Sequence, residues 1–282
     1  MALAQFKTGD LTAARATLGE TGSAEPDVVY LRGKIIEGLG DAAGAREVIA
    51  ACRMQPLNEI VCSDAAVAAM RHDRFGEALD LVHAALEKSP GSVTLLLPAA
   101  LAQFRLGRYK DAIRTYRAVL ERAPQLDAAR EGLGFLYYMT GDLTAARPLV
   151  EERMKAPNAD FYLAYLDAMI LYRLSPQLRA EAAGAVEHAI RANPRFAPAY
   201  FLRGKIYMDQ NNPGAALADF QRAAEIDPKY PLPYYKMAQI YSRQGRTSEA
   251  AGARMKFDEL GSLREEETLM RQAQDVLMPA RH

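Results

Sequence analysis

The sequence predicts an all-α fold, a solenoid of stacked helix–turn–helix units. Short strings recur along the chain: TGDLTAAR occurs at Thr8–Arg15 and again at Thr140–Arg147. ALAQF and LRGKI also occur twice each, and the spacing of every pair is close to a multiple of about 34 residues. Apolar residues recur at intervals of three and four, which is the period of an amphipathic helix. Such a repeat predicts hairpins that bury their apolar faces by stacking on their neighbours.

The clearest unit spans residues 197–230 and contains two helical stripes separated by a turn. The first stripe is Tyr200, Gly204 and Tyr207, and the second is Ala216, Phe220 and Ala223. Between them lies DQNNPG, a run of turn-forming residues. Pro228 follows the second stripe and ends its helix. The unit is therefore predicted to be a helix–turn–helix.

This unit resembles a tetratricopeptide repeat, whose pattern is W-x2-L-G-x2-Y, then A-x3-F, then P. The matching residues are Tyr200, Arg203, Gly204, Tyr207, Ala216, Phe220 and Pro228. Arg203 replaces the usual leucine, although its aliphatic stem can still pack. The resemblance implies a right-handed α-solenoid, and the excess of arginine over lysine together with abundant alanine favours a bacterial source. The same frame divides the chain into a partial repeat at 1–25, repeats at 26–58, 59–92, 93–126, 127–160, 161–196, 197–230 and 231–261, and a capping helix at 262–278.

Small residues are expected where the two helices of each repeat cross, because only they allow a close approach. The residues in this slot are Gly33, Ala66, Ala100, Gly134, Ala168, Gly204 and Ala238. In the duplicated octapeptide, Gly9 and Gly141 are expected to form the turn, where a positive φ costs glycine little. The repeat at 161–196 needs two extra residues in its turn, around Leu174–Leu178.

The two ends of the array differ. At the C-terminal end, Ser262 and Glu265 have the spacing of a capping box, ahead of an apolar stripe with a charged opposite face. At the N-terminal end the front half of the first repeat is missing. We therefore expect the chain to be a fragment, or to start at a misassigned Met1. The open apolar end favours end-to-end association as an additional mode of contact.

The balance of positive and negative charges limits the kinds of partner that the chain can bind. Lys+Arg and Asp+Glu both number 35, and this balance argues against nucleic acid or an anionic membrane as the main partner. No apolar run approaches the roughly 18 residues that span a bilayer. Cys52 and Cys62 are interpreted as buried small hydrophobes, with a disulfide between them as the alternative in an oxidising compartment. The localisation is left open between cytoplasm and periplasm.

The sequence contains no recognisable catalytic or metal-binding motif. The four histidines have no metal-ligand spacing, and no glycine-rich phosphate loop or Gly-x-Ser-x-Gly elbow occurs. We therefore expect no enzyme activity, no metal and no cofactor.

A ligand groove is implied by the resemblance, because the first helix of each repeat lines the concave face in this family. The lining positions in this frame are Tyr30, Lys34, Ser63, Val67, Leu97, Leu101, Phe104, Glu131, Phe135, Tyr138, Met139, Tyr162, Tyr165, Met169, Tyr172, Phe201, Lys205, Met208, Tyr235, Gln239 and Arg243. The residues chosen from them for a peptide-binding groove are Phe104, Phe135, Tyr138, Tyr165, Tyr172, Phe201, Lys205 and Tyr235. Aromatic side chains offer a large contact area, so this set favours an extended peptide or a short amphipathic helix as ligand. The alternative is that several of these rings belong to the core. The carboxylate clamp of heat-shock co-chaperones is excluded, because Lys34 and Lys205 are suitably located but the asparagines are missing.

Three functional hypotheses follow. The first is a non-catalytic scaffold that binds a protein or peptide partner through this groove. The second is the substrate-recognition arm of a larger enzyme, and the third is a bacterial envelope assembly factor for pilus, secretion or outer-membrane biogenesis.

Overall fold

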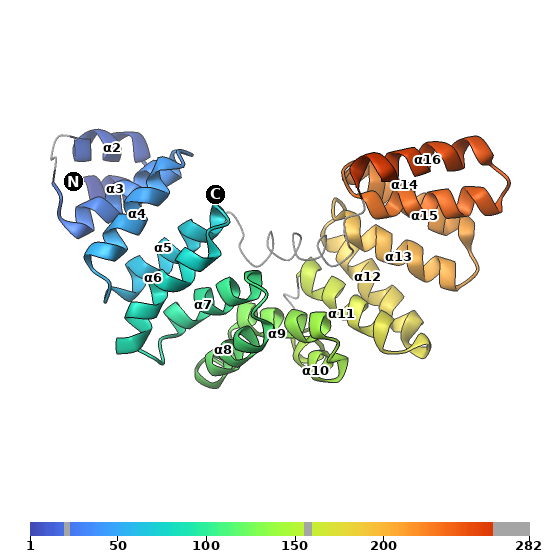
Figure 1. Cartoon of the computed structure of the whole chain (residues 1–282), viewed down its shortest axis with the longest axis horizontal. Helices are drawn as coiled ribbons and strands as arrows, with labels where there is room; N and C mark the ends of the chain where they lie inside the picture. Colours follow the sequence, from blue (N-terminus) through green and yellow to red (C-terminus); the bar gives the residue numbers. More distant parts are fainter. Residues whose placement is uncertain (20–22, 155–159, 262–282) are drawn as a thin grey trace. The chain divides into compact units, whose positions relative to one another are not determined.

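The computed structural model describes residues 1–19, 23–154 and 160–261, and these residues fold into α-helical hairpins (Figure 1). The described ranges contain sixteen α-helices, one 3-10 helix and no strand, so the predicted all-α solenoid class is confirmed. The chain divides into two compact units, one ending at Leu136 and the next beginning at Tyr137, and each is described by itself.

The first unit is built from consecutive antiparallel hairpins. Its helices are α1 (Ala2–Lys7), α2 (Leu11–Gly19), α3 (Pro26–Gly38), α4 (Ala43–Met54), α5 (Glu59–Arg71), α6 (Phe75–Lys88), α7 (Val93–Arg105), α8 (Tyr109–Arg122) and the first part of α9 (Asp127–Thr140). Each first helix packs on its partner, as α3 does on α4, and each second helix packs on the next hairpin, as α4 does on α5. This is the stacking that the repeat period predicts.

The second unit continues the same pattern. After the end of α9 its elements are α10 (Leu143–Met154), α11 (Phe161–Leu174), the 3-10 helix η1 (Pro176–Leu178), α12 (Arg179–Ala192), α13 (Ala197–Asp209), α14 (Pro213–Ile226), α15 (Pro231–Arg243) and α16 (Thr247–Leu260). The turn of the α11–α12 hairpin, where extra residues were expected, contains η1. The division into repeats remains a prediction, and the capping helix expected at 262–278 lies outside the described residues.

The duplicated octapeptide has the same conformation in both places. Gly9 and Gly141 both have φ near 83°, so the predicted left-handed turn is present twice. The side chains of Asp10 and Asp142 accept hydrogen bonds from the backbone N–H groups of Ala13 and Ala145, at 3.0 and 3.2 Å. Each aspartate therefore satisfies an otherwise unpaired donor at a helix start. One string encodes one turn because the determinants of the turn are local.

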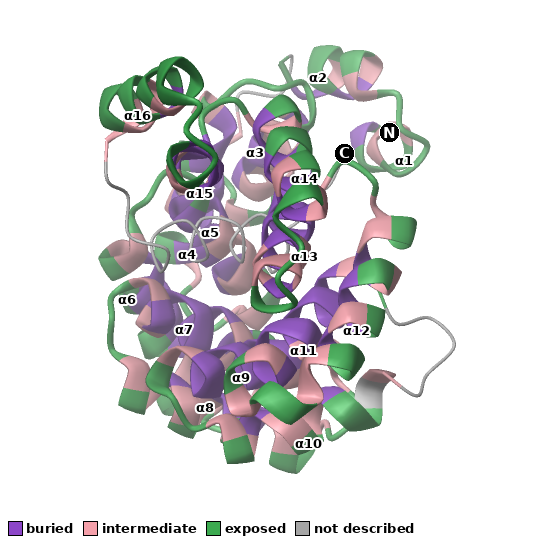
Figure 2. Cartoon of the chain, turned by 90° about the vertical axis from the view of Figure 1, so that its right-hand side faces the viewer, coloured by how far each residue is buried: buried purple, intermediate pink, exposed green. Residues whose placement is uncertain are grey.

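Close helix crossings depend on glycine, as predicted. A Cβ atom added to Gly204 of α13 would lie 2.5 Å from Cε1 of Phe220 on α14. A Cβ atom on Gly33 of α3 would lie 2.8 Å from both Cγ2 and the backbone nitrogen of Val48 on α4. Most residues of the central helices α11 and α13 are buried (Figure 2).

The two cysteines form a disulfide, so their interpretation as unpaired small hydrophobes is wrong. Cys52 lies near the end of α4 and Cys62 near the start of α5, with a Cα–Cα distance of 4.8 Å. Both are buried, as expected. The bond joins two successive hairpins, because the turn between α4 and α5 brings positions ten residues apart together.

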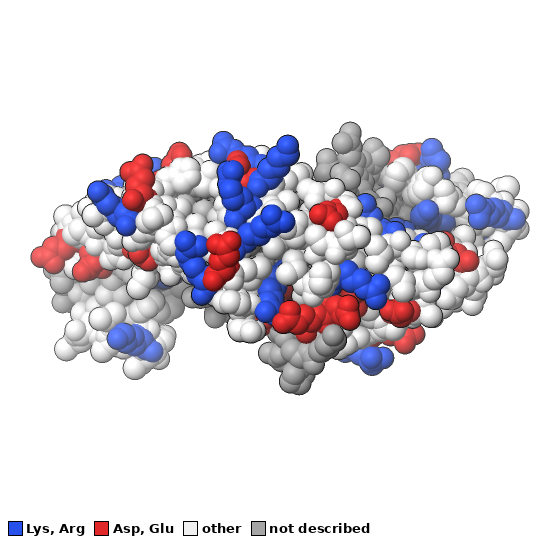
Figure 3. Space-filling model, turned by 90° about the horizontal axis from the view of Figure 1, so that it is seen from below, with Lys and Arg blue, Asp and Glu red and all other residues white. Residues whose placement is uncertain are grey.

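The surface carries charges of both signs. On the face seen in Figure 3, Lys and Arg side chains lie interspersed with Asp and Glu. Across the described residues, many charged side chains pair at helical spacing, as Arg246 does with Glu249 and Lys256 with Glu259, both at 2.9 Å. Exposed pairs of this kind contribute little to stability but keep the surface soluble.

Candidate interaction groove

Five of the eight predicted groove residues are buried: Phe104, Phe135, Tyr138, Tyr165 and Phe201 are each 7% exposed or less. The expectation that they form open surface is wrong for these five, and the reason is contact with neighbouring rings. Phe104 and Phe135 meet edge to face at 5.7 Å between centroids. Tyr165 packs in the same way on Phe196 at 5.0 Å.

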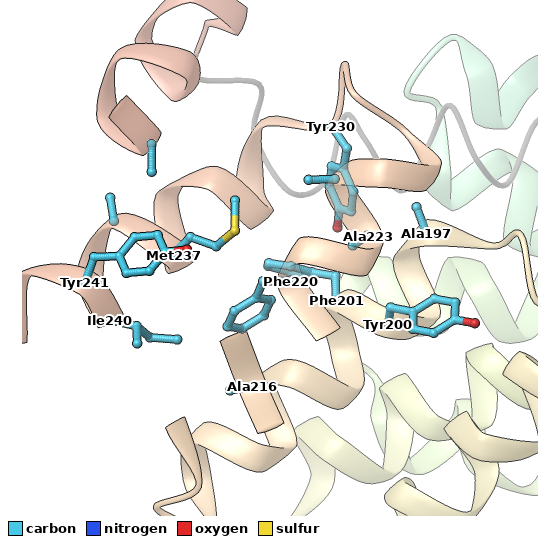
Figure 4. Close-up of a cluster of buried hydrophobic side chains, with 13 residues drawn as sticks. Ala197, Tyr200, Phe201, Ala216, Phe220, Ala223, Tyr230, Met237, Ile240 and Tyr241 are labelled. Atoms are coloured by element: carbon cyan, nitrogen blue, oxygen red, sulfur yellow. The ribbon is translucent and has the colours of Figure 1, made fainter. Parts of the chain in front are cut away.

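Phe201 shows the packing in most detail (Figure 4). Its ring lies 5.6 Å from that of Phe220 and 5.3 Å from that of Tyr230, the residue just before α15. The following hairpin therefore covers Phe201. These aromatic rings belong to the hydrophobic cluster that packs successive hairpins of the second unit together.

Tyr172 and Lys205 are half-buried and belong to a local cationic cluster. The Arg179 guanidinium lies 3.8 Å from the centre of the Tyr172 ring, and the Lys205 Nζ lies 4.9 Å from it. Arg179 also forms an ion pair with Asp209 at 3.0 Å. Two cations thus lie close to the ring, whose electron-rich face attracts them.

Among the eight predicted groove residues, Tyr235 lines an open pocket. The pocket has a volume of about 500 Å³ and lies between α15 and α16. Its lining consists of Tyr235, Ala238, Gln239, Ser242, Arg243, Ala250, Ala251 and Arg254. Three of the predicted lining residues, Tyr235, Gln239 and Arg243, are thus brought together. We call this pocket the α15 groove.

Arg243 extends the groove toward the preceding hairpin. It also lines a second pocket, of about 310 Å³, together with Met208, Asn211, Pro213, Ile240 and Gln244. Within the described residues, Arg243 makes no ion pair and no side-chain hydrogen bond. Arg254, by contrast, pairs with Asp258 at 3.5 Å. The α15 groove therefore presents a guanidinium with unused donors beside an aromatic ring, an amide and a hydroxyl.

The equivalent face of the first unit is chemically different. The Tyr30 hydroxyl donates to Asp64 at 2.7 Å, and Lys34 forms an ion pair with the same carboxylate at 2.9 Å. Burial and the neighbouring Asp64 carboxylate raise the pKa of Tyr30. Lys34 is thus already neutralised by Asp64.

Sequence reasoning missed the α16 side of the groove. Ala250, Ala251 and Arg254 come from a second helix, whereas the resemblance directed attention to first helices alone. The small size of the two alanines is the only signal in the sequence, because short side chains leave room for a pocket.

No group of three or more His, Cys, Asp or Glu side chains suitable for a metal occurs in the described ranges. Among the described helices, none has the length and apolar character needed to cross a bilayer.

The fold is that of an α-helical repeat protein, and comparisons identify the family. A family model described as TPR repeat matches residues 204–245, and one described as tetratricopeptide repeat matches residues 63–127 and 97–162. The chain is a tetratricopeptide-repeat protein. Repeats of this family generally serve as non-catalytic scaffolds for protein–protein interaction.

Solved structures agree on the fold. A tetratricopeptide repeat protein from Parabacteroides merdae has a TM-score of 0.68 at 19% identity, covering 91% of this chain and all of its own length. The APC/C hetero-tetramer Cut9-Hcn1 also gives 0.68, at 14% identity, over 94% of this chain and 52% of the other. MamA gives 0.50 at 21% identity, over 60% of this chain and 91% of its own. At these identities the likeness extends to the fold alone.

Proposed function

We propose that this chain is a non-catalytic scaffold that binds an acidic peptide segment of a protein partner in the α15 groove. The observation that carries the proposal is Arg243, whose guanidinium lines two adjoining pockets and has no partner among the described residues. A guanidinium in this setting favours a carboxylate, because it can donate two parallel hydrogen bonds. Tyr235 beside it offers a flat surface for an apolar or aromatic side chain of the same segment.

The ligand is an extended peptide or a short amphipathic helix. Helical-repeat grooves accept both forms, and the volume of the α15 groove suits a few side chains rather than a folded domain. The partly buried Tyr172–Lys205 cluster lies on earlier helices of the same unit and adds a second cation. The five buried rings contribute by holding the hairpins in register, not by touching the ligand.

Selection from a random peptide library tests this function. Peptides selected on the intact chain should be enriched in Asp or Glu next to an apolar or aromatic residue. Their affinity, measured by fluorescence anisotropy, should fall about tenfold or more for Arg243→Gln and for Tyr235→Ala. Arg114→Gln on α8 is the matched control, since the Arg114 side chain is 80% exposed. Equal binding by Arg243→Gln and the unaltered chain would refute the proposal.

A second candidate function is favoured by the disulfide. Structural disulfides persist mainly in oxidising compartments such as the periplasm. The Cys52–Cys62 bond therefore supports the hypothesis of an envelope assembly factor, in which the scaffold works outside the cytoplasm. Thiol alkylation after acid quenching and denaturation of the native cells, read as a gel shift, tests this, because denaturation exposes both cysteines, which are buried in the fold. Protection of both cysteines until a reductant is added would support an envelope location, and immediate alkylation would contradict it.

A further inference from the structure

A second surface lies on the turn between α4 and α5, in the first unit. Three of the eight exposed large apolar side chains in the described ranges fall within this short stretch. Met54 is 47% exposed, Leu57 is 61% exposed and Ile60 is 65% exposed. We call these three residues the α4–α5 knuckle. Single exposed apolar residues are ordinary, but three of them on one short turn indicate a contact site.

The knuckle is held in place by covalent and polar bonds. The Cys52–Cys62 disulfide closes the turn from both sides, and Met54, Leu57 and Ile60 all lie between the two cysteines. The Asn58 side chain accepts a hydrogen bond from the backbone N–H of Val61 and so caps the start of α5. A backbone segment fixed in one arrangement loses little conformational entropy when a partner binds.

Carboxylates surround the knuckle. Asp27 accepts a hydrogen bond from Gln55 at 3.2 Å, and Glu59 directly precedes Ile60. Hydroxyl donation from Ser92 and Ser89 holds the pKa of Glu59 below its usual value, so it is ionised. Asp80 lines a pocket of about 290 Å³ next to Cys52 and Pro56.

These carboxylates are not neutralised by the part of the chain that the structure describes. Asp27, Glu59 and Asp80 make no ion pair with a described residue. The nearby cation Arg53 is already bound to Glu77 at 2.6 Å. The surroundings of the knuckle therefore carry unbalanced negative charge, whereas the α15 groove carries an unpaired guanidinium.

We infer that the α4–α5 knuckle docks a basic, apolar segment of a partner protein, in which aliphatic or aromatic side chains cover Met54, Leu57 and Ile60 while Lys or Arg side chains meet Asp27, Glu59 and Asp80. The adjacent pocket accepts one side chain between Pro56 and Leu81. Complementary charge gives such a contact its specificity and speeds its formation. The inference is independent of the proposed function, because the two surfaces differ in location and select peptides of opposite charge.

Selection of a random peptide library on the full chain, with counter-selection against Leu57→Ser/Ile60→Ser, tests the inference. The selected peptides should combine large apolar residues with an excess of Lys and Arg. Their affinity for Leu57→Ser/Ile60→Ser should fall about tenfold or more, and binding should weaken at high salt. Cys52→Ala/Cys62→Ala should weaken binding as well, because the turn is no longer closed. Circular dichroism should show that every variant remains as helical as the original.

Met255→Ser on α16 is the matched control, since Met255 is also exposed, at 71%, and should leave binding unchanged. Selection of no knuckle-dependent peptides, or of acidic ones, would overturn the inference. A concentration-dependent dimer that Leu57→Ser/Ile60→Ser abolishes would make a second copy of the chain the occupant, and would overturn it too. Unchanged binding by Cys52→Ala/Cys62→Ala would overturn the role given to the disulfide.

Discussion

Phe201 and Tyr235 occupy the same position, the fifth residue, of the first helices of two successive hairpins, α13 and α15. Phe201 is 4% exposed and packs on Phe220 and Tyr230. Tyr235 is half-buried, lies 5.3 Å from the ring of Phe257, and lines the α15 groove. Equivalent aromatic residues thus have different surroundings.

Position in a repeat therefore does not decide whether an aromatic ring is structural or available for binding. The following hairpin decides it, because Tyr230 at the start of α15 covers Phe201. In a solenoid each hairpin contacts mainly its neighbours, so burial is determined one interface at a time.

The largest effect is expected from Phe201→Ala. Removing a ring that is buried between three helices leaves a cavity and should lower the free energy of unfolding by about 3–5 kcal/mol. Urea denaturation followed by circular dichroism measures it. A decrease in the free energy of unfolding below about 1 kcal/mol would mean that Phe201 does not contribute to packing between the hairpins.

Gly204→Leu should have the next largest effect. The added side chain would meet Phe220, whose Cε1 lies 2.5 Å from the position of the new Cβ. Overpacking of this kind costs about 1–3 kcal/mol, and a melting curve of the variant measures it. Gly252→Ala on α16 is the control, since no atom lies within 4 Å of its Cβ position. An unchanged melting temperature for Gly204→Leu would show that the crossing of α13 and α14 tolerates a side chain.

Two charged residues at equivalent positions of different repeats also have different surroundings. Asp167 on α11 and Arg203 on α13 are both the seventh residue of a first helix. Arg203 binds Asp219 through two nitrogens, both at 2.8 Å. Burial raises the pKa of Asp167 to about 6, Arg147 opposes this rise, and Glu151 and Glu181 add to it. The charge of Arg203 is thus satisfied, whereas that of Asp167 is disfavoured.

Asp167→Asn should therefore stabilise the chain in a pH-dependent way. The pKa of Asp167 is higher in the folded chain than in the unfolded chain, so protonation of this carboxyl group stabilises the fold. The contribution is complete below about pH 4 and is lost as the pH rises through about 6. At about pH 8 the variant should be more stable than the original by about 1–2 kcal/mol, after allowance for the partial exposure of Asp167. At about pH 4 the two should differ little. Urea denaturation at both values measures the difference, and a gain that is equal at both would contradict this assignment.

The fold could be predicted from the sequence because its determinants are local and repeat. Gly9 with Asp10, and Gly141 with Asp142, specify the same turn wherever the octapeptide occurs. The Cys52–Cys62 bond could not be predicted with the same certainty, because each cysteine also fits a slot for a small apolar residue. Only the path of the α4–α5 turn shows that their Cα atoms lie 4.8 Å apart.

The groove could be predicted only in part. The repeat frame identified Tyr235, Gln239 and Arg243 as lining residues of the last hairpin, and all three line one pocket. The same frame also selected Phe104 and Phe201, which are buried, because it takes no account of rings such as Phe135 and Tyr230 that pack against them. Exposure depends on contacts between repeats, and a single-repeat pattern does not contain them.

The smallest effect on stability is expected from Tyr235→Ala, and this variant also gives the most direct test. Because Tyr235 lines an open pocket, its loss should cost less than about 1 kcal/mol in free energy of unfolding. Its affinity for peptides selected on the intact chain should nevertheless fall about tenfold or more, as measured by fluorescence anisotropy. A destabilisation as large as that of Phe201→Ala, or unchanged peptide affinity, would contradict the distinction between the structural and the binding aromatic residue.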